Sequence, residues 1–576
     1  MRHKNNRQNS KKTDRDSRTL PAVLMWVVPM ILTIPSVVLS IMGHYSWAAA
    51  LAQILLPLGV MLALISCWRR VGVTTLCMLP LMVLAAFQIV LLYLYADGSI
   101  IGVDMFLNVL TTNSSEALEL LGNLLPAILT VLVLFLPLLI TAIAITRRGW
   151  GVNSSRRRMS ALSGCLIAAL GTLALATTLA SERSYKIDED FYPVNVCSNM
   201  VEACMRSYKS GNYYEDSASF TFETETTRPD SIREVYIAVI GETSRADNWQ
   251  LFGYDRYTTP YLCSMADTAV AAYGRTLSES NTTHKAVPLL LSTLTAEDFG
   301  KNINRSKSVV TAFKEAGYAT DFISMQARNH SYIDFFAFEA DSTIFLREPE
   351  PGTVNHSVYD IDALPLVDSI LAGGKGKQLI VLHLYGSHFN YCDRYSREQA
   401  YFLPDRYQDA TIVNRGRLIN AYDNSIRQTD RLLYELMVRL DSIGCLGGLV
   451  FTSDHGEDIY DDARHRFLHA SPTPTFQQLH VPFLIHMTSG LRREHPELWL
   501  AAKANEKMKV SSSASFAPTL LSLAGLRTDK ADVTKDLTSA DYSEVTDPIF
   551  LNDLNRAETL EEAGFASQDF TRLSRL

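Results

Sequence analysis

The stretch VYIAVIGETSRAD, residues 235–247, decides the fold. Its first six residues form a short apolar run rich in β-branched side chains, which is typical of a buried strand. The run stops at a glycine, and Glu242 follows directly. A second stretch, GLVFTSDHGE at 448–457, repeats this arrangement, with Asp454 and His455 shortly after its apolar residues. Both stretches therefore predict a buried strand whose end carries side chains able to bind a metal ion.

Other segments of the second half extend this pattern. Three further apolar runs predict strands at Thr320 to Ser324, Leu379 to Leu384 and Val481 to His486. Helical periodicity falls between or after the strands, at Ser308 to Ala316, Asp362 to Ala372, Gly416 to Leu440 and Ser513 to Leu523. This order predicts an α/β domain over residues 233–576, with a mostly parallel sheet and helices on both faces.

The side chains at the strand ends suggest a catalytic site. In a parallel sheet the carboxyl ends of the strands meet at one edge, where ligands bind. Glu242, Asp454 and His455 would give a cation two carboxylates and one imidazole and leave one position open, as in catalytic zinc sites. The alternative is that Glu242 caps a helix and the other two form a local loop pair. His388, after the strand at 379–384, and His469, shortly after His455, favour the catalytic interpretation.

The first half of the 576-residue chain is dominated by apolar stretches, and 47% of all residues are hydrophobic. A helix of about 20 apolar residues spans the hydrocarbon core of a membrane. Five stretches reach this length: Pro21 to Met42, Trp47 to Trp68, Thr74 to Ala96, Leu124 to Ile145 and Ala161 to Ala180. The sequence therefore predicts a transmembrane domain of five helices over residues 19–181.

Basic residues predict the orientation of these helices. They crowd the tail at 1–18, the link after the second stretch and the link after the fourth, so these parts face the cytoplasm. Everything after the fifth stretch then lies outside. Residues 182–232 are polar with little periodicity, which predicts a linker over the membrane surface. Cys197 and Cys204 are the candidates for a disulfide there, because they would close a short loop in an oxidising compartment.

The link between the third and fourth stretches, near 102–121, is too apolar for an ordinary loop. Asn108, Thr112 and Glu116 are spaced four residues apart and share one face of a helix. We expect an interfacial helix that points hydrogen-bonding groups at a lipid headgroup. A surface helix with a solvated polar stripe is the alternative.

These motifs together resemble the phosphoethanolamine transferases that modify lipid A or lipopolysaccharide, whose catalytic domains are similar in fold to alkaline phosphatases and sulfatases. The resemblance covers nearly the whole chain. Its most specific motifs are GETSRADNWQLFGYDRYTTP at 241–260, YDNSIRQTD at 422–430 and SDHGE at 453–457. HVPFL at 480–484 and GSH at 386–388 support it.

The resemblance implies a threonine nucleophile, which falls on Thr283 in ESNTTHKAVP, with Thr282 as the competing residue. It implies zinc as the cofactor, with one ion and a second left open, and it implies phosphate contacts and proton transfer by two histidines. The implied zinc ligands are Glu242, Thr283, Asp454 and His455; the histidines are His388 and His469; the headgroup residues are Asn108, Thr112 and Glu116.

The resemblance also implies a reaction. Phosphoethanolamine passes from phosphatidylethanolamine to the threonine and then to lipid A or a core sugar, outside a bacterial inner membrane. We expect a monomer and no nucleic-acid partner, since the predicted domain shows no basic stripe. The better-known members carry cysteines where this chain has Glu279 and Leu289. The alternatives are a phosphoglycerol transferase of the lipoteichoic acid synthase type and a membrane-bound phosphodiesterase or sulfatase.

Overall fold

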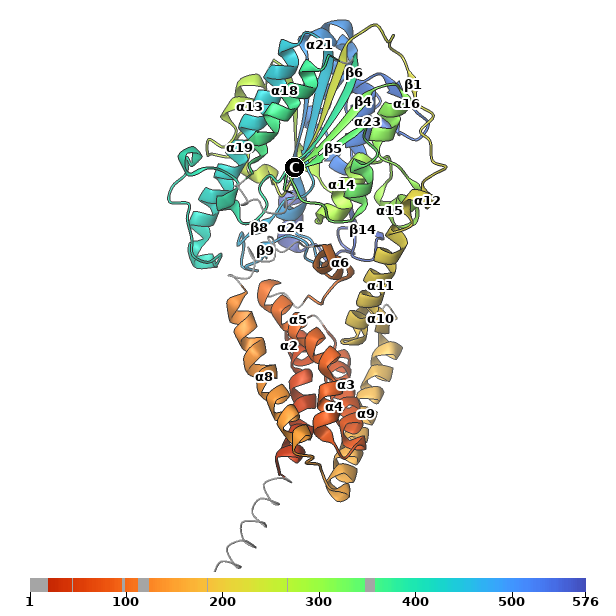
Figure 1. The fold of residues 1–576 in the computed structure, drawn as a ribbon, viewed down its shortest axis with the longest axis vertical. Coiled ribbons are helices and arrows are strands. Elements are labelled where there is room, and N and C mark those ends of the chain that lie inside the picture. Colours follow the sequence, from red (N-terminus) through yellow and green to blue (C-terminus); the bar gives the residue numbers. More distant parts are fainter. Residues whose placement is uncertain are drawn as a thin grey trace, which may run out of the picture. The chain divides into compact units, whose positions relative to one another are not determined.

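A computed structural model describes the parts of the chain at 19–43, 45–95, 99–111, 124–183, 185–266, 268–347, 358–374 and 376–576. The described residues fall into two compact units. The first lies within Met1–Phe106 and Leu121–Ala203, and the second within Leu107–Leu120 and Cys204–Leu576. The colours of Figure 1 follow the chain through both units.

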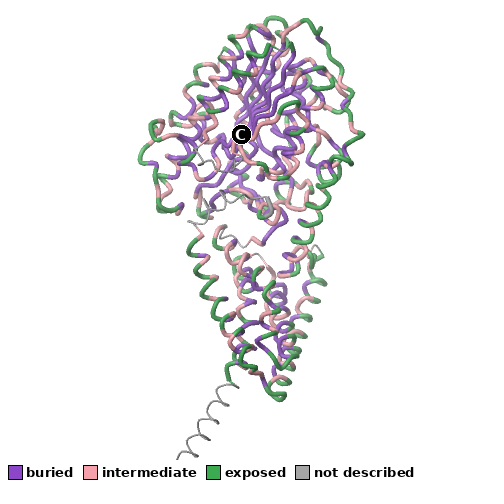
Figure 2. The backbone as a smooth tube through the Cα atoms, in the orientation of Figure 1, coloured by how far each residue is buried: buried purple, intermediate pink, exposed green. Residues whose placement is uncertain are grey.

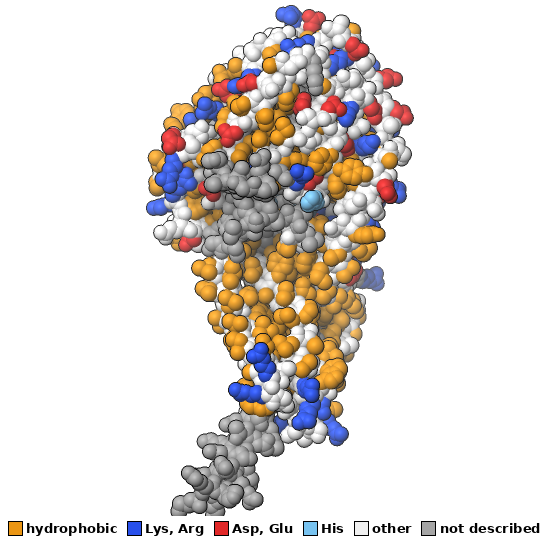
Figure 3. Space-filling view, viewed as in Figure 1, with side chains coloured by type: hydrophobic (Ala, Val, Ile, Leu, Met, Phe, Trp, Pro, Cys, Tyr) orange, Lys and Arg blue, Asp and Glu red, His pale blue; other side chains and the backbone are white. Residues whose placement is uncertain are grey.

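The first unit consists of helices that are long and apolar enough to cross a membrane. Four qualify singly: Thr19–Met42, α3 (Trp47–Cys67), α8 (Leu125–Arg147) and α9 (Ser154–Ser181). Hydrophobic side chains cover the exposed surface of these helices, and Lys and Arg side chains gather at one end (Figure 3). Because a helix in water would bury its apolar side chains, this coat identifies a surface made for lipid.

The third predicted span is broken. It consists of α4 (Val71–Cys77) and a second helix, α5 (Leu79–Tyr95), and the two are bent by 54°. Pro80 explains the break, since it lacks an amide proton and its ring clashes with the carbonyl four residues before it. The prediction of five spans is confirmed if this bent pair counts as one.

Glycines bring α3 and α9 into close contact. A Cβ on Gly59 would come within 2.3 Å of Ala168 N, and one on Gly164 within 2.6 Å of Ala63 N. Small residues at such positions let two helix backbones approach, which is how membrane helices gain packing energy without a hydrophobic driving force.

About half of the segment predicted to be a linker, 182–232, is helical. It contains α10 (Ile187–Asp190), α11 (Val194–Ser210) and α12 (Tyr213–Asp216). The buried positions of α11 include Asn195 and Asn199, so polar residues interrupt the apolar stripe and hide its period. Asn199 Nδ2 donates to the carbonyl of Ile101, which satisfies this buried amide. All described cysteines are free, and Cys197 and Cys204 lie seven residues apart in one helix, about 10 Å along its axis.

An eight-stranded sheet forms the centre of the second unit, in the order β11-β3-β10-β7-β2-β6-β4-β5. The strands are β2 (Glu234–Gly241), β3 (Val270–Leu277), β4 (Ala319–Ser324), β5 (Ser342–Phe345), β6 (Lys377–His383), β7 (Leu446–Ser453), β10 (His480–Met487) and β11 (Val510–Ser511). Within this sheet β10 alone runs opposite to the others. The predicted α/β class and the mostly parallel sheet are confirmed.

Helices cover both faces of the sheet (Figure 1). One face carries α13 (Pro260–Met265), α18 (Leu364–Ala372) and α19 (Arg415–Ser442). The other face carries α14 (Thr283–Leu291), α16 (Val309–Glu315) and α23 (Ser512–Leu523). Further helices are α15 (Ala296–Asn302), α17 (Tyr332–Ala337), α20 (Phe476–Leu479), α21 (Ser489–Glu494), α22 (Pro496–Ala504) and α24 (Ser567–Leu573). Three two-stranded ribbons complete the unit: β1 (Glu225–Thr226) with β12 (Leu526–Arg527), β8 (Asp458–Ile459) with β9 (Phe467–Leu468), and β13 (Ile549–Leu551) with β14 (Ala557–Thr559).

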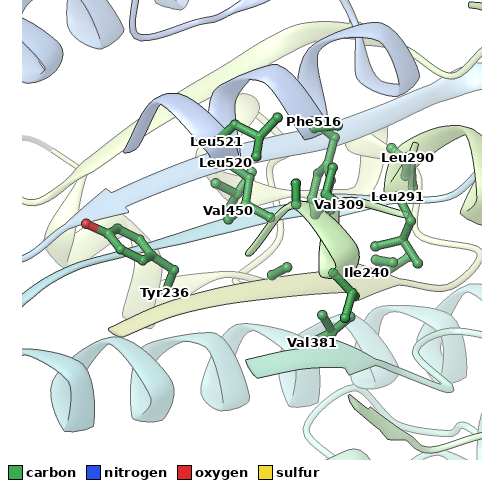
Figure 4. Packing of buried hydrophobic residues seen from close by; sticks show 14 of the residues in the cluster. Tyr236, Ile240, Leu290, Leu291, Val309, Val381, Val450, Phe516, Leu520 and Leu521 are labelled. Atoms are coloured by element: carbon green, nitrogen blue, oxygen red, sulfur yellow. The ribbon is translucent and has the colours of Figure 1, made fainter. Parts of the chain in front are cut away.

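The central strands are buried along their whole length, as the tube in Figure 2 shows. Phe516 and Leu520 of α23 belong to the same buried cluster as Val450 of β7 and Ile240 of β2 (Figure 4). Strands covered on both faces read as continuous apolar runs, which is why the sequence revealed them. This packing fixes the ends of β2 and β7 side by side.

Candidate active site

The ends of β2 and β7 place three predicted ligands together. The two strands are parallel neighbours, with Gly241 opposite Ser453. Glu242 and Asp454 follow these two residues, so their carboxylates leave adjacent strands at the same edge. The ligand atoms of Glu242, Asp454 and His455 all lie within 4.8 Å of one another, and all three residues are buried.

Thr283 brings a hydroxyl to the same point. It is the first residue of α14, and its Oγ1 lies 3.2 Å from His455 Nε2 and 3.3 Å from Glu242 Oε2. The competing residue, Thr282, directs its hydroxyl elsewhere, with Oγ1 3.2 Å from Ser280 Oγ. Of the two threonines, only Thr283 hydrogen-bonds to members of this cluster.

The hydrogen bonds around the cluster leave one nitrogen of His455 and one oxygen of Asp454 available to bind a cation. His455 Nδ1 lies 2.9 Å from the carbonyl of Gly456, which makes Nδ1 the donor and frees the Nε2 lone pair. Asp454 Oδ1 accepts from the amides of Thr243 at 3.0 Å and His455 at 2.7 Å. Its other oxygen, Oδ2, is buried and receives no hydrogen bond from the described residues. A buried carboxylate oxygen without a hydrogen bond, 3.2 Å from an imidazole nitrogen that carries a lone pair, fits a metal ion.

Burial makes the cluster costly without a cation. It raises the pKa of Glu242 to about 8, helped by the charge of Asp454 nearby, and raises the pKa of Asp454 to about 7. Burial also lowers the pKa of His455 to about 4. Each shift disfavours the charged form of its group. A divalent cation would reverse this penalty for both carboxylates and would bind the neutral imidazole as it stands.

The two predicted phosphate-contacting histidines lie next to the cluster. The ring centroid of His469 is 4.2 Å from that of His455 and 6.0 Å from that of His388. Burial lowers the pKa of His469 to about 4 and holds the pKa of His388 well below its usual value. Both imidazoles are therefore neutral near pH 7. Nδ1 of His388 lies 2.6 Å from the carbonyl of Phe389 and Nδ1 of His469 lies 3.1 Å from Glu457 Oε1, so each ring can donate to an anion through Nε2 only when it is protonated.

Two further residues, Gln326 and Glu457, contact the cluster or its neighbouring histidine, and the sequence did not predict a role for either. Gln326, just after β4, donates from Nε2 to Glu242 Oε2 at 2.9 Å and to the carbonyl of Leu384 at 3.0 Å. Glu457 lies 3.1 Å from His469 Nδ1 through Oε1 and accepts from Tyr391 OH at 2.9 Å through Oε2. Both residues follow the end of a strand, which is the feature of the sequence that could have indicated them. Glu457 is the last residue of the SDHGE motif, whereas no residue type that binds metals marks the surroundings of Gln326.

Of the three residues predicted to contact a lipid headgroup, the structure describes only Asn108. Asn108 is half-buried in α6 (Val103–Thr111). Thr112 and Glu116 lie outside the described residues.

Named relatives match part of the chain. The Kdo(2)-lipid A phosphoethanolamine 7''-transferase of Escherichia coli strain K12 is 28% identical over 277 residues, 47% of this chain and 46% of the relative. The phosphoethanolamine transferase CptA of Salmonella typhimurium is 27% identical over 322 residues, 54% of each chain. The chain thus spans about half the length of these curated relatives. The resemblance to phosphoethanolamine transferases is confirmed.

Solved structures share the fold. The integral membrane protein lipooligosaccharide phosphoethanolamine transferase A from Neisseria meningitidis has a TM-score of 0.69 and 19% identity, covering 90% of this chain and 97% of that one. The C-terminal periplasmic domain of EptC from Escherichia coli, solved in complex with Zn, has a TM-score of 0.54 and 24% identity, covering 60% and 98%. Because residues 234–526, slightly more than half of the chain, match the family described as Sulfatase, the chain belongs to the sulfatase family.

Proposed function

We propose that this chain transfers phosphoethanolamine from phosphatidylethanolamine to lipid A or to the lipopolysaccharide core, through a covalent intermediate on Thr283. One observation carries the proposal: the Thr283 hydroxyl hydrogen-bonds to two members of a buried Glu, Asp and His cluster. A threonine hydroxyl is inert at neutral pH unless its surroundings stabilise the alkoxide. The relatives that match are named as phosphoethanolamine transferases, which gives the class of the transferred group.

Zinc is the proposed cofactor, held by Glu242, Asp454 and His455. When bound, zinc supplies a Lewis acid that lowers the pKa of a nearby hydroxyl and offsets charge on phosphoryl oxygens. The donor set fits this ion, because two carboxylates and one imidazole are hard or borderline ligands and leave a position open. A second ion near His388 and His469 belongs to the same proposal.

The chain's own residues carry the group transfer. The Thr283 hydroxyl loses its proton to solvent, and Oγ1 forms a bond to phosphorus while the bond from phosphorus to the diacylglycerol oxygen breaks. His388 or His469 gives a proton to that oxygen, because the anionic phosphate raises the pKa of an imidazole beside it. In the second half the same histidine takes the proton of an acceptor hydroxyl, whose oxygen forms a bond to phosphorus as the bond to Thr283 Oγ1 breaks. Thr283 Oγ1 takes up a proton from solvent and returns to its starting state, and ping-pong kinetics result.

The membrane helices give the reaction its location. The chain is a multi-pass protein of the bacterial inner membrane, with the sulfatase unit in the periplasm. Donor and acceptor are both lipids whose headgroups lie at the bilayer surface, so an anchored enzyme meets them there. Asn108, Thr112 and Glu116 are proposed to hold the ethanolamine end of the donor, with Glu116 facing the ammonium group.

A donor assay tests the proposal against its rivals. Full-length protein in liposomes receives phosphatidylethanolamine or phosphatidylglycerol, each labelled in the headgroup, together with a lipid A acceptor. We expect label from phosphatidylethanolamine on the acceptor and on Thr283. Label from phosphatidylglycerol alone would indicate a phosphoglycerol transferase. Release of free phosphoethanolamine without acceptor labelling would indicate a hydrolase.

A further inference from the structure

Large apolar side chains of the second unit are exposed in one connecting segment and in a loop joined to it by Arg427. Val413 is 89% exposed, Leu403 66%, Tyr257 61%, Tyr401 56% and Ile412 43%. We call these five residues the apolar rim. Four of them lie within residues 401–413 of one connecting segment. Surface loops of soluble domains are usually polar, and a group of exposed apolar side chains marks a binding surface.

Hydrogen bonds hold this segment in a defined shape. Asn424, buried in α19, accepts from the amides of Tyr401 at 2.9 Å and Phe402 at 2.8 Å through Oδ1. Its Nδ2 donates to the carbonyl of Phe402 at 3.0 Å. Arg427 joins two parts of the rim: its guanidinium lies 4.2 Å from the ring centroid of Tyr401 and donates to the carbonyl of Tyr257. The apolar rim is therefore presented on a fixed backbone, which lowers the entropic cost of binding.

Exposed arginines lie in the same segment as most of the apolar rim. Residues 394–417 contain five arginines and three acids. Arg394 and Asp405 are buried and Arg415 pairs with Asp461, which leaves Arg397, Arg406 and Arg417 exposed against Glu398 and Asp409. The whole chain has the opposite balance, with 53 basic and 61 acidic residues. Arg406 and Arg417 are both exposed, and Arg417 Nη1 donates to the carbonyl of Arg406 at 2.9 Å. The surface therefore offers positive charge next to apolar side chains.

Four residues of the apolar rim belong to the connection that leaves the carboxyl end of β6 and leads to α19. This connection also carries His388. Tyr391 at its beginning packs against Tyr422, with ring centroids 5.1 Å apart, and hydrogen-bonds to Glu457. Most residues of the rim are therefore close in the sequence to residues of the candidate active site.

We propose that the apolar rim and its arginines bind the headgroup region of a membrane that contains anionic phospholipid. Side chains as exposed as Val413 and Leu403 protrude, and a deformable lipid surface accepts them without a preformed groove. Tyr and Arg are suited to this region, because each has an apolar body and a polar end. Arg406 and Arg417 complement the negative surface potential of such a membrane. This inference goes beyond the proposed function and does not depend on the transfer reaction.

Photocrosslinking on the full-length protein tests this inference. A benzoylphenylalanine replaces Val413 in protein reconstituted into bilayers of phosphatidylethanolamine and phosphatidylglycerol. The control probe replaces Leu500 in α22, which is 67% exposed but lies outside the rim. After illumination we expect a mass gain of one phospholipid at position 413 and none at position 500. Equal adducts at both positions, or crosslinks from position 413 to a second copy of the chain, would overturn the proposal.

A double variant tests whether the positive charge of Arg406 and Arg417 contributes to membrane binding. R406E and R417E together, in the protein with the probe at 413, should lose most of the lipid adduct, and unchanged adduct yield would contradict the electrostatic part. Repeating the assay in Thr283→Ala separates the two proposals, because lipid adducts need no turnover. Adducts that persist in this inactive variant support membrane binding whatever the reaction is.

Discussion

Thr283 Oγ1 lies 3.2 Å from Nε2 of His455, and the two residues come from segments 172 positions apart. Thr283 begins a nine-residue helix, whose N-terminal partial positive charge favours a negative oxygen there. The position of this hydroxyl thus depends on the helix start as well as on the sheet edge.

Replacing Thr283 with Ala should abolish both lipid modification and the labelled protein intermediate, because no other group replaces the lost oxygen. Thr282→Ala is the matched control and should retain activity, since its hydroxyl contacts Ser280 rather than the cluster. Mass spectrometry of the protein after incubation with labelled donor measures the intermediate. Normal labelling of Thr283→Ala would move the nucleophile to another residue.

Zinc binding should strengthen as the pH rises from about 6 to about 8. Without metal, Glu242 has a pKa of about 8 and Asp454 about 7, so the ion must displace protons from carboxyl groups below these values. Raising the pH removes this competition. Competition with a chelator of known affinity measures the zinc affinity at each pH. A pH-independent affinity would contradict the proposed ligand set.

Metal should also stabilise the folded protein. Zinc at about 100 times its dissociation constant adds roughly 2.7 kcal/mol to the free energy of unfolding. Asp454→Asn should abolish this gain, because the substituted amide presents a weaker ligand in place of the carboxylate. Thermal unfolding in detergent, with and without added zinc, measures the difference. Equal stabilisation of Asp454→Asn would place the ion elsewhere.

Gln326 is predicted to position Glu242. Gln326→Leu should lower zinc affinity by roughly 10- to 100-fold, the range found when a group that orients a metal ligand is removed. Gln378→Leu is the control: Gln378 donates from a strand to the carbonyl of Ile370, away from the cluster. The same chelator competition provides the measurement, and equal affinities of the two variants would exclude this role.

Gly164 should tolerate no larger side chain. Gly164→Leu forces a side chain against the backbone of α3 and should destabilise the first unit by about 1–3 kcal/mol or more. Leu166→Ala, on the exposed face of the same helix, should have a much smaller effect in detergent. Thermal unfolding followed by circular dichroism compares the two. A stable Gly164→Leu variant would show that α3 and α9 can separate at little cost.

The sequence predicted the buried strands best. β2, β6 and β7 each contain an apolar run, because helices cover both faces of the sheet, and acids or histidines follow these runs. β3 was missed, since glycine, arginine and threonine interrupt its sequence VAAYGRTL before the last residue. Gln326 was missed for a related reason: an amide that orients a ligand has no characteristic spacing. These features depend on contacts between distant segments, which local patterns do not contain.

In the membrane half, too, the sequence predicted the apolar segments but not the features that depend on single polar residues or prolines. The length and apolarity of its spans follow from composition, so most of their ends were predicted within a few residues. α9 begins at Ser154, seven residues before the predicted start, because its first turns are polar and basic. The break before α5 depends on one proline, and apolar content does not reveal it. α11 went unnoticed because buried asparagines take places that apolar residues usually fill.

The central position of β2 has a consequence for how the protein is made. β2 is the first long strand of its sheet to be synthesised, yet both of its neighbours, β6 and β7, come much later in the chain. The amide of Thr243 and the carboxylate of Asp454 that it bonds are 211 residues apart. Such contacts have high sequence separation and form slowly. A partly exported chain therefore has no metal site, and the apolar β2 must be shielded from aggregation until the last ligands arrive.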